Sequence, residues 1–477
     1  MKKLISLLIC TMLVFTAVSA EDFAPQIDIG DGEAMNAFFN TLLNVTERNY
    51  RFDVTREELL EAAIKQVMSE HPELFDSFAK GAYTALDENS SYLGSDDFQN
   101  VSEDVMGQFD GIGINVLATD DRTIIGAPID GTPAALAGLS AGDIITNVDG
   151  IDITGYVLDQ TVALIRGKKG TSVTLEIRRG NTSFEVTIVR DTIKINPVSY
   201  RKLDKNNAGY VSINSFNANT SDYLDAALRD LKSQGADKII LDLRNNLGGL
   251  LIEAILVSSY FLPPDTAVVT EDFKDAENNI TYSTIETDIN FKSVVLINEY
   301  SASASEIVAA AISENGAGTL VGKTSFGKGT VQQSLKMKNG GAMWLTIARY
   351  LTPKGNYIHE VGIQPEHYIN NKTGQMDMTG FAEVQGKRAL TVGDTGEDVL
   401  AIEQRLSGLG FSLESVDEVY DTQTELAVRR FQELNDLFPY GVADLTTQMC
   451  ISTEAYQAEV VIDKQLEKAL ELIYDMK

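Results

Sequence analysis

The chain has 477 residues, 44% of them hydrophobic and 8% aromatic, so it can bury real cores, and its length favours about three domains. Its 39 basic and 69 acidic residues give a net charge of −30, which excludes nucleic acid as a favoured partner because phosphate backbones are repelled. The sequence has three histidines and two cysteines, and no HExxH or CxxC motif. We therefore expect no metal site, no cofactor and no disulfide framework.

Residues 1–20 have the pattern of an export signal. Two lysines precede the apolar run Leu4–Val18, and small residues up to Ala20 follow it before the acidic Glu21. This order is typical of a cleaved signal peptide. An uncleaved membrane anchor is the alternative, since the run lies at the lower limit for spanning a bilayer. With either outcome, we expect an exported protein that is secreted or held in the cell envelope.

Residues 21–105 are acidic and follow a helical pattern, with Leu59, Ala63 and Val67 recurring at four-residue spacing. We interpret this segment as an N-terminal helical arm. The hydrophobic period then changes to two, and a hairpin with alternating apolar residues follows. Residues 106–192 are therefore expected to form a small β-rich domain.

From residue 193 to 385, predicted strands alternate with predicted helices, which is typical of an α/β sheet with both faces covered. Residues 386–450 contain helical runs and form a small helical module, and residues 451–477 end in an amphipathic helix. The predicted fold class is multidomain, with an α/β core, a β domain and helical parts at both ends.

A cluster of small residues lies where one core strand gives way to a helix. The strand Val294–Asn298 leads into Ser301-Ala-Ser-Ala-Ser-Glu, at the place where α/β folds hold their ligands. A serine there lies beside unpaired helix N–H groups, which can stabilise an oxyanion. The same serines can also be read as helix caps and small packing residues. The serines alone do not decide between these readings, so evidence for catalysis has to come from a second residue that can act as a general base.

Two residues of this region are candidates for that base. His359 is the weaker one. Lys328 is flanked by two glycines, which allow the backbone to pack closely around the amine and exclude water. Such surroundings disfavour the ammonium form, and a lysine acts as a base only as the neutral amine. Gln332 follows four residues later, on the same side of an extended chain as Lys328, so its uncharged amide can orient the amine.

These segments resemble the carboxyl-terminal processing (tail-specific) serine peptidases, and the resemblance covers nearly the whole chain. Ser301–Glu306 is similar to the family's nucleophile segment and Gly327–Gln332 to its lysine segment, with the expected separation of 25 residues between the two functional positions. The resemblance implies that Ser303 is the nucleophile, Lys328 the general base and Gln332 the third member of a Ser-Lys-Gln arrangement. It leaves His359 without a catalytic role, in a turn or on the surface.

The segment Leu241–Leu250 resembles the part of the family that supplies an oxyanion hole. The resemblance implies one N–H from Gly248 or Gly249 and a second from Ala304.

The β-rich segment resembles the PDZ domain that these peptidases insert before their catalytic core. Its loop of Gly111, Ile112, Gly113 and Ile114 looks like the carboxylate-binding loop, whose N–H groups receive a peptide's terminal carboxylate while the peptide adds to a sheet edge. A purely structural β module would show the same strands. Arg166 either lies free on the surface or couples this domain to the core.

Residues 388–450 resemble a three-helix peptidoglycan-binding module. The usual Asp-Gly turn is replaced by Asp417-Glu418, and Asp421 stands where glycine is common, so a docking or dimer-contact module is the alternative. The helical arm and the final helix look like the parts through which related enzymes dimerise, which predicts a homodimer.

The sequence thus predicts a secreted or envelope-attached serine endopeptidase that recognises the C-termini of proteins or peptides through its PDZ domain. The alternative is a catalytically silent cell-wall scaffold that binds peptides and peptidoglycan. The presence of Ser303, Lys328 and Gln332 together favours the enzyme, because a scaffold has no physical need for all three.

Overall fold

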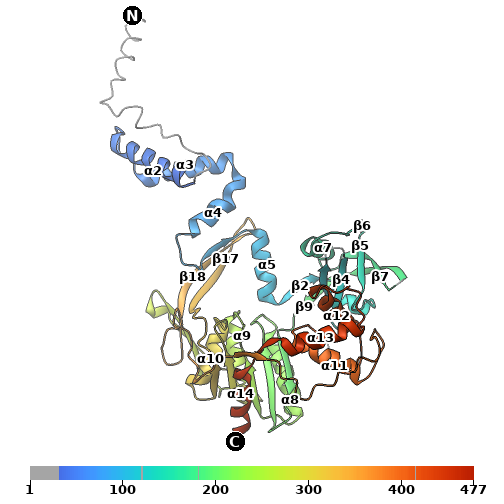
Figure 1. The fold of residues 1–477 in the computed structure, drawn as a ribbon. Coiled ribbons are helices and arrows are strands. Elements are labelled where there is room, and N and C mark those ends of the chain that lie inside the picture. Colours follow the sequence, from blue (N-terminus) through green and yellow to red (C-terminus); the bar gives the residue numbers. More distant parts are fainter. Residues whose placement is uncertain (1–31, 120–121, 181, 414, 477) are drawn as a thin grey trace, which may run out of the picture. The chain divides into compact units, whose positions relative to one another are not determined.

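The computed structural model describes residues 32–119, 122–180, 182–413 and 415–476, so the predicted export signal lies outside the described residues. The chain divides into two units, residues 1–86 and 87–477 (Figure 1). None of the helices in the described ranges has both the length and the apolar character needed to cross a membrane. The described part of the first unit is helical, with α2 (Gly32–Asn49), α3 (Arg56–Glu70), the short 3-10 helix η2 (Pro72–Leu74) and α4 (Phe75–Tyr83).

The second unit contains a β domain whose strands pair in the order β3-β4-β5-β7-β8, with β6 added to β5. Strand β3 ends this order, so one of its edges carries no partner strand in the described residues. Alternate residues point inward, and Val173, Leu175 and Ile177 are fully buried. The elements are β3 (Ile114–Thr119), β4 (Arg122–Pro128), α6 (Pro133–Leu136), β5 (Ile144–Val148), β6 (Ile151–Asp152), α7 (Leu158–Ile165), β7 (Ser172–Arg179) and β8 (Thr182–Val189).

Two paired strands bracket the β domain where the chain enters and leaves it. Strand β2 (Gln108–Gly111) is antiparallel to β9 (Asp191–Lys194). Before β2, helix α5 (Ser95–Met106) ends at Gly107, which has φ +60°. A side chain at this position would collide with Asn217 of the α/β core, so only glycine allows the helix to end against that loop.

The α/β core is built on a six-stranded sheet with the order β10-β11-β12-β15-β16-β19. Strand β10 is antiparallel to β11, and the other neighbours are parallel. The strands are β10 (Val198–Lys202), β11 (Ala208–Ile213), β12 (Lys238–Asp242), β15 (Lys292–Ile297), β16 (Gly318–Gly322) and β19 (His367–Tyr368). The helices that pack on the sheet are α8 (Thr220–Ser233), α9 (Leu251–Ser259), α10 (Ala304–Glu314) and α14 (Lys464–Asp475).

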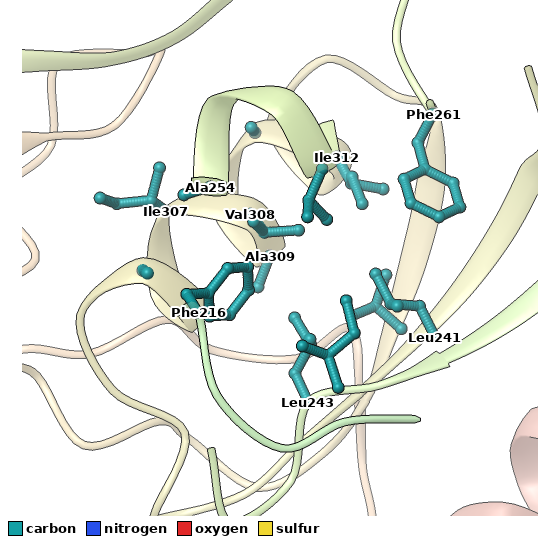
Figure 2. Packing of buried hydrophobic residues seen from close by; sticks show 14 of the residues in the cluster. Phe216, Leu241, Leu243, Ala254, Phe261, Ile307, Val308, Ala309 and Ile312 are labelled. Atoms are coloured by element: carbon teal, nitrogen blue, oxygen red, sulfur yellow. The ribbon is translucent and has the colours of Figure 1, made fainter. Parts of the chain in front are cut away.

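Both faces of this sheet are buried, which explains the unbroken apolar runs of its central strands. On one face, Leu241 and Leu243 join a cluster with residues of α9 and α10, among them Ala254 and Ile307 (Figure 2). The other face of the same strands contributes to a second cluster, which α14 closes with two fully buried residues. The members of this second cluster are Leu203, Ala208, Ile240, Val294, Leu296, Val321, Ala469 and Ile473. The predicted final helix is therefore part of the core's packing.

A second sheet carries the segment that follows Lys328. Its strands follow the order β1-β18-β13-β14, and β17 pairs with β18. The register shifts between Val331 and Gln332, because Ile347 of β18 is an extra residue that bulges opposite them. The elements are β1 (Ser91–Leu93), β13 (Ala267–Phe273), η3 (Ala276–Asn278), β14 (Ile280–Ser283), β17 (Thr330–Lys336) and β18 (Ala342–Leu351).

The helical module is inserted into the core. Strands β20 (Lys372–Gln375) and β21 (Glu459–Ile462) pair antiparallel immediately before and after it. The module consists of α11 (Glu397–Gly408), α12 (Thr422–Leu434) and α13 (Leu445–Gln457). Asp421, one of its departures from the expected pattern, is the N-cap of α12 and accepts a hydrogen bond from the N–H of Thr424 at 2.8 Å.

Candidate active site

Ser303 lies at the end of the segment that joins β15 to α10, as the residue before the helix begins. It has φ +56° and ψ −115°, a backbone conformation that costs a residue with a side chain on the order of 1–3 kcal/mol. Its N–H donates to Oε2 of Glu306 at 2.8 Å, which helps to hold this conformation. The strained turn places the serine at the N-terminus of a buried helix, where unpaired N–H groups favour negative charge.

Gly248 packs directly against this turn. A Cβ atom at Gly248 would lie 2.8 Å from Cβ of Ser303 and 3.0 Å from the nitrogen of Ala304, so no other residue fits without a shift. The N–H of Gly248 already donates to Oδ1 of Asn246 at 2.8 Å. In the described residues no hydrogen bond is shown for the N–H groups of Gly249 and Ala304. Of the predicted oxyanion donors, these two are the open ones.

Glu306 connects the nucleophile segment to the lysine segment. Its carboxylate is fully buried and accepts four hydrogen bonds, from the N–H groups of Ser303 (2.8 Å), Gly327 (2.7 Å) and Lys328 (2.8 Å) and from Oγ of Ser325 (2.6 Å). Burial raises the pKa of Glu306, and these hydrogen bonds oppose part of that increase. Sequence reasoning missed this residue. The Ser-x-x-Glu spacing from Ser303, which is that of a capping box, could have revealed it.

The backbone around Lys328 is tightly packed, as its two flanking glycines suggest. The carbonyl of Gly327 accepts from the N–H of Glu360 at 2.9 Å, and a Cβ at Gly329 would collide with the backbone of His359. His359 thus lies in a turn against the lysine segment. Its Nδ1 is buried and has no hydrogen-bond partner within the described ranges.

The side chains of the three predicted catalytic residues are not joined by hydrogen bonds in the described part of the chain. Nε2 of Gln332 donates to Oγ1 of Thr330 at 2.7 Å and to Oγ1 of Thr346 at 3.2 Å. The structure therefore brings together the backbone segments of Ser303 and Lys328 through Glu306, and it orients the amide of Gln332 through Thr330 and Thr346. A connected Ser-Lys-Gln triad stays a prediction.

Large apolar side chains are exposed on the three loops of this site. Leu247 is 69% exposed, Tyr300 56% and Phe326 59%. The loops contact one another through hydrogen bonds, including the N–H of Phe326 to the carbonyl of Ser301 at 3.0 Å and the N–H of Ala302 to the carbonyl of Asn246 at 3.0 Å. Sequence reasoning did not select these residues, because exposure cannot be read from residue type alone.

The predicted carboxylate-binding loop leads from β2 into β3. Gly113 has φ +81° and packs so closely on Thr132 that a side chain would collide with it. Within the described residues, no hydrogen bond is shown for the N–H groups of Ile112 and Gly113. The loop thus offers open donors next to the free edge of β3, which is the arrangement that peptide addition to a sheet requires.

Arg166 follows α7 and reaches out of the β domain to α5. Its guanidinium forms an ion pair with Glu103 at 3.0 Å and stacks over the ring of Phe109 at 4.6 Å. Arg166 is thus a partly exposed surface residue that also has partners. These contacts favour the coupling interpretation, although the partners lie in α5 and β2 and not in the α/β core itself.

Metal chemistry was not expected here. Among the residues that the structure describes, no group of three His, Cys, Asp or Glu side chains is arranged to hold a metal ion.

Models of three known families match the chain. Peptidase family S41 matches residues 207–369, a PDZ domain matches residues 124–179, and a peptidoglycan binding domain matches residues 395–450. These matches confirm the predicted architecture of a PDZ domain, a serine peptidase core and a helical C-terminal region.

The chain is similar in sequence to known proteins over most of its length. The carboxy-terminal processing protease CtpA of Bacillus subtilis is 34% identical over 424 residues, which cover 87% of this chain and 89% of that protein. A CtpA-like serine protease of Staphylococcus haemolyticus is 35% identical over 388 residues, or 80% of this chain and 77% of that protein. The solved structure of the photosystem II D1 C-terminal processing protease is 25% identical and covers 70% of this chain and 92% of its own, with a TM-score of 0.40.

Proposed function

Because this chain belongs to the carboxyl-terminal processing serine peptidases of family S41, we propose that it is an endopeptidase in which Ser303, Lys328 and Gln332 carry out the chemistry. One observation supports this most strongly. Ser303 is held at positive φ against Gly248, beside the open N–H groups of Gly249 and Ala304. A serine that serves only as a helix cap does not need this strain.

The reaction is acyl transfer. The neutral amine of Lys328 takes the proton of the Ser303 hydroxyl as Oγ attacks the substrate carbonyl carbon. The carbonyl oxygen becomes an oxyanion, which accepts hydrogen bonds from Gly249 and Ala304. The C–N bond then breaks, and the lysine ammonium donates its proton to the leaving amine. Water attacks the acyl-enzyme by the same route, so that Ser303 and the amine of Lys328 are restored.

Substrate recognition is assigned to the PDZ domain. The open N–H groups of Ile112 and Gly113 would bind a terminal carboxylate, and the peptide would extend β3 at its free edge. The exposed Leu247, Tyr300 and Phe326 offer apolar contacts to an unfolded peptide at the nucleophile.

Location and assembly belong to the same proposal. The pattern of residues 1–20 supports export to the cell envelope or the medium, and the family match of residues 395–450 supports attachment to peptidoglycan. The helical arm exposes Phe39, Leu42, Val67 and Phe78, which suits a homodimer contact. Pelleting of the purified protein with insoluble peptidoglycan would support the attachment, and a protein that stays in the supernatant would favour docking instead.

The experiment that tests the activity is hydrolysis of a fluorogenic peptide by the full chain and by two variants. Ser303→Ala and Lys328→Ala are each expected to abolish turnover. A wild-type protein without hydrolytic activity would favour the scaffold alternative, and an active Lys328→Ala variant would overturn the assignment of the base.

A further inference from the structure

The amide of Gln332 has a defined orientation in this structure. Its Nε2 carries two hydrogens, and both are donated, to the hydroxyls of Thr330 and Thr346. No described group donates to its Oε1. The carbonyl oxygen is therefore the one open polar atom of the amide, and it is an acceptor.

The hydroxyl of Thr346 can act toward Gln332 only as an acceptor, because its single hydrogen is used elsewhere. Oγ1 of Thr346 donates to Oδ1 of Asp87 at 2.9 Å. If the amide turned over, its carbonyl oxygen would face the lone pairs of this hydroxyl, and a partly buried hydrogen bond would be replaced by a repulsive contact.

Asp87 is held in place by the segment that follows it. Oγ of Ser90 donates to Oδ2 of Asp87 at 2.8 Å and accepts from the N–H of Thr346 at 3.0 Å. Partial burial raises the pKa of Asp87, but the hydrogen bonds from Ser90, Thr346 and Asn89 together lower it below its usual value. The carboxylate thus stays ionised as an acceptor at neutral pH.

We propose that Asp87, acting through Thr346, is a positioning residue that fixes the amide of Gln332 with its carbonyl oxygen open to the amine of Lys328. This inference rests on the proposed function. A carbonyl oxygen accepts an N–H of the amine and leaves the nitrogen lone pair free for the proton of Ser303. An amide turned the other way would donate to that lone pair and occupy the base.

The decisive variant is Thr346→Val, which keeps the shape of the side chain and removes the hydroxyl. We expect kcat on a short peptide to fall about tenfold, at the low end of what the loss of an orienting partner costs, while KM changes less than about twofold. Thr346→Ser keeps the hydroxyl and should restore most of kcat. Thr270→Val is the matched control, since its hydroxyl lies in the same sheet and, among the described residues, bonds to Thr281 alone.

Two further readouts separate this role from general stability. Combined with Gln332→Ala, Thr346→Val should have no additional effect on kcat, because its influence passes through the amide. Asp87→Ala should lower kcat in the same way but more weakly, and Asp87→Asn, which still offers an acceptor oxygen, should remain close to the wild type.

The outcomes distinguish the two proposals. If Thr346→Val and Asp87→Ala keep the wild-type kcat while Lys328→Ala is inactive, the positioning role is wrong and the proposed chemistry stands. If Lys328→Ala is active, both are wrong. If Thr346→Val unfolds at the assay temperature, the pair Asp87→Ala and Asp87→Asn decides: equal activity of the two overturns the inference, and selective loss in Asp87→Ala supports it.

Discussion

The two halves of the candidate site are built in different ways. The nucleophile half is fixed by backbone: Ser303 at positive φ, Gly248 packed on its Cβ, and α10 buried in the core. The base half depends on side chains, since Gln332 is oriented by hydroxyls and the Lys328 side chain shows no hydrogen bond in the described part of the chain. The nucleophile half is thus preorganised, and the base half is adjustable.

The difference follows from where each half lies. Strand β15 is buried along nearly its whole length before it delivers Ser303, whereas β17 becomes exposed after Gln332. Close packing resists the adjustment of a single side chain, whereas an exposed strand whose partner strand carries a bulge allows it. We expect a substitution in the nucleophile half to abolish most of the activity at once, and a substitution in the base half to lower the activity by degrees.

The largest expected effect tests whether the two halves form one catalytic unit. The double variant Ser303→Ala/Lys328→Ala should be no less active than either single variant, because members of one unit are not additive. Lys328→Arg should also be inactive, since a guanidinium does not deprotonate in proteins. Peptide hydrolysis measures both, and appreciable turnover by Lys328→Arg would contradict the role of a neutral amine.

The next effect concerns the rigid half. Gly248→Ala should lower kcat by about 10²–10³-fold, as the loss of an oxyanion donor does, because its methyl group would displace Ser303 and Ala304. Gly235→Ala is the control: it has a similar positive φ of +89°, with nothing within 4 Å of the added atom. Comparable kcat values for the two variants would show that backbone strain, and not the approach to Ser303, causes the loss.

Glu306 joins the two halves, and its replacement should cost about 10–100-fold in kcat. Glu306→Gln removes the charged acceptor that the N–H groups of Ser303 and Lys328 share, so the two segments are no longer held together. Because burial raises the pKa of Glu306, it is protonated at a higher pH than an ordinary glutamate, and activity should decline as pH falls through that raised value. The titratable groups on the segments packed around it are Lys328, His359 and Glu360.

The measurement is kcat against pH for the wild type and for Glu306→Gln. The acid decline due to Glu306 should be missing in the variant, whose amide does not titrate. Superimposable profiles would show that this carboxyl does not titrate in the working range.

A smaller effect is expected at the β domain. Arg166→Ala should lower cleavage of full-length substrates by a few-fold, about the value of one ion pair and one cation–π contact, through loss of the tie to Glu103 and Phe109. Hydrolysis of short peptides should change less. Calorimetric titration with free and amidated C-terminal peptides provides the control, since the free carboxylate should bind more tightly in both proteins.

The smallest effect should be seen in His359→Ala. Its Nδ1 is buried without a partner in the described residues, so removal of the ring eliminates an unsatisfied polar atom and no known hydrogen bond. Activity should remain within about twofold of the wild type in the peptide assay. Loss of turnover in His359→Ala would indicate that His359, and not Lys328, is the base. The assignment of the base half would then be wrong.

The sequence could predict the rigid half better than the adjustable one. Ser303, Gly248 and Ala304 belong to local strand–turn–helix patterns, whose geometry is set by neighbouring residues. The role of Glu306 could have been inferred from its spacing to Ser303. The orientation of Gln332 depends on Asp87, which is distant in the chain, and periodicity carries no information about such a pair.

The same limit applies to the fold. The amphipathic pattern of residues 462–476 predicts a helix but does not say what its apolar face covers. In the structure, Ala469 and Ile473 are buried on the core sheet. The insertion of the helical module between β20 and β21 is likewise a long-range pairing that no local motif encodes.

The return of the chain to the core after the helical module has a consequence for biosynthesis. On the second face of the catalytic sheet, Ile240, Val294 and Leu296 are covered by α14. A chain cut before residue 464 would leave this apolar face exposed to water and prone to aggregation. During synthesis, this face of the peptidase sheet is therefore covered only after nearly the whole polypeptide has emerged.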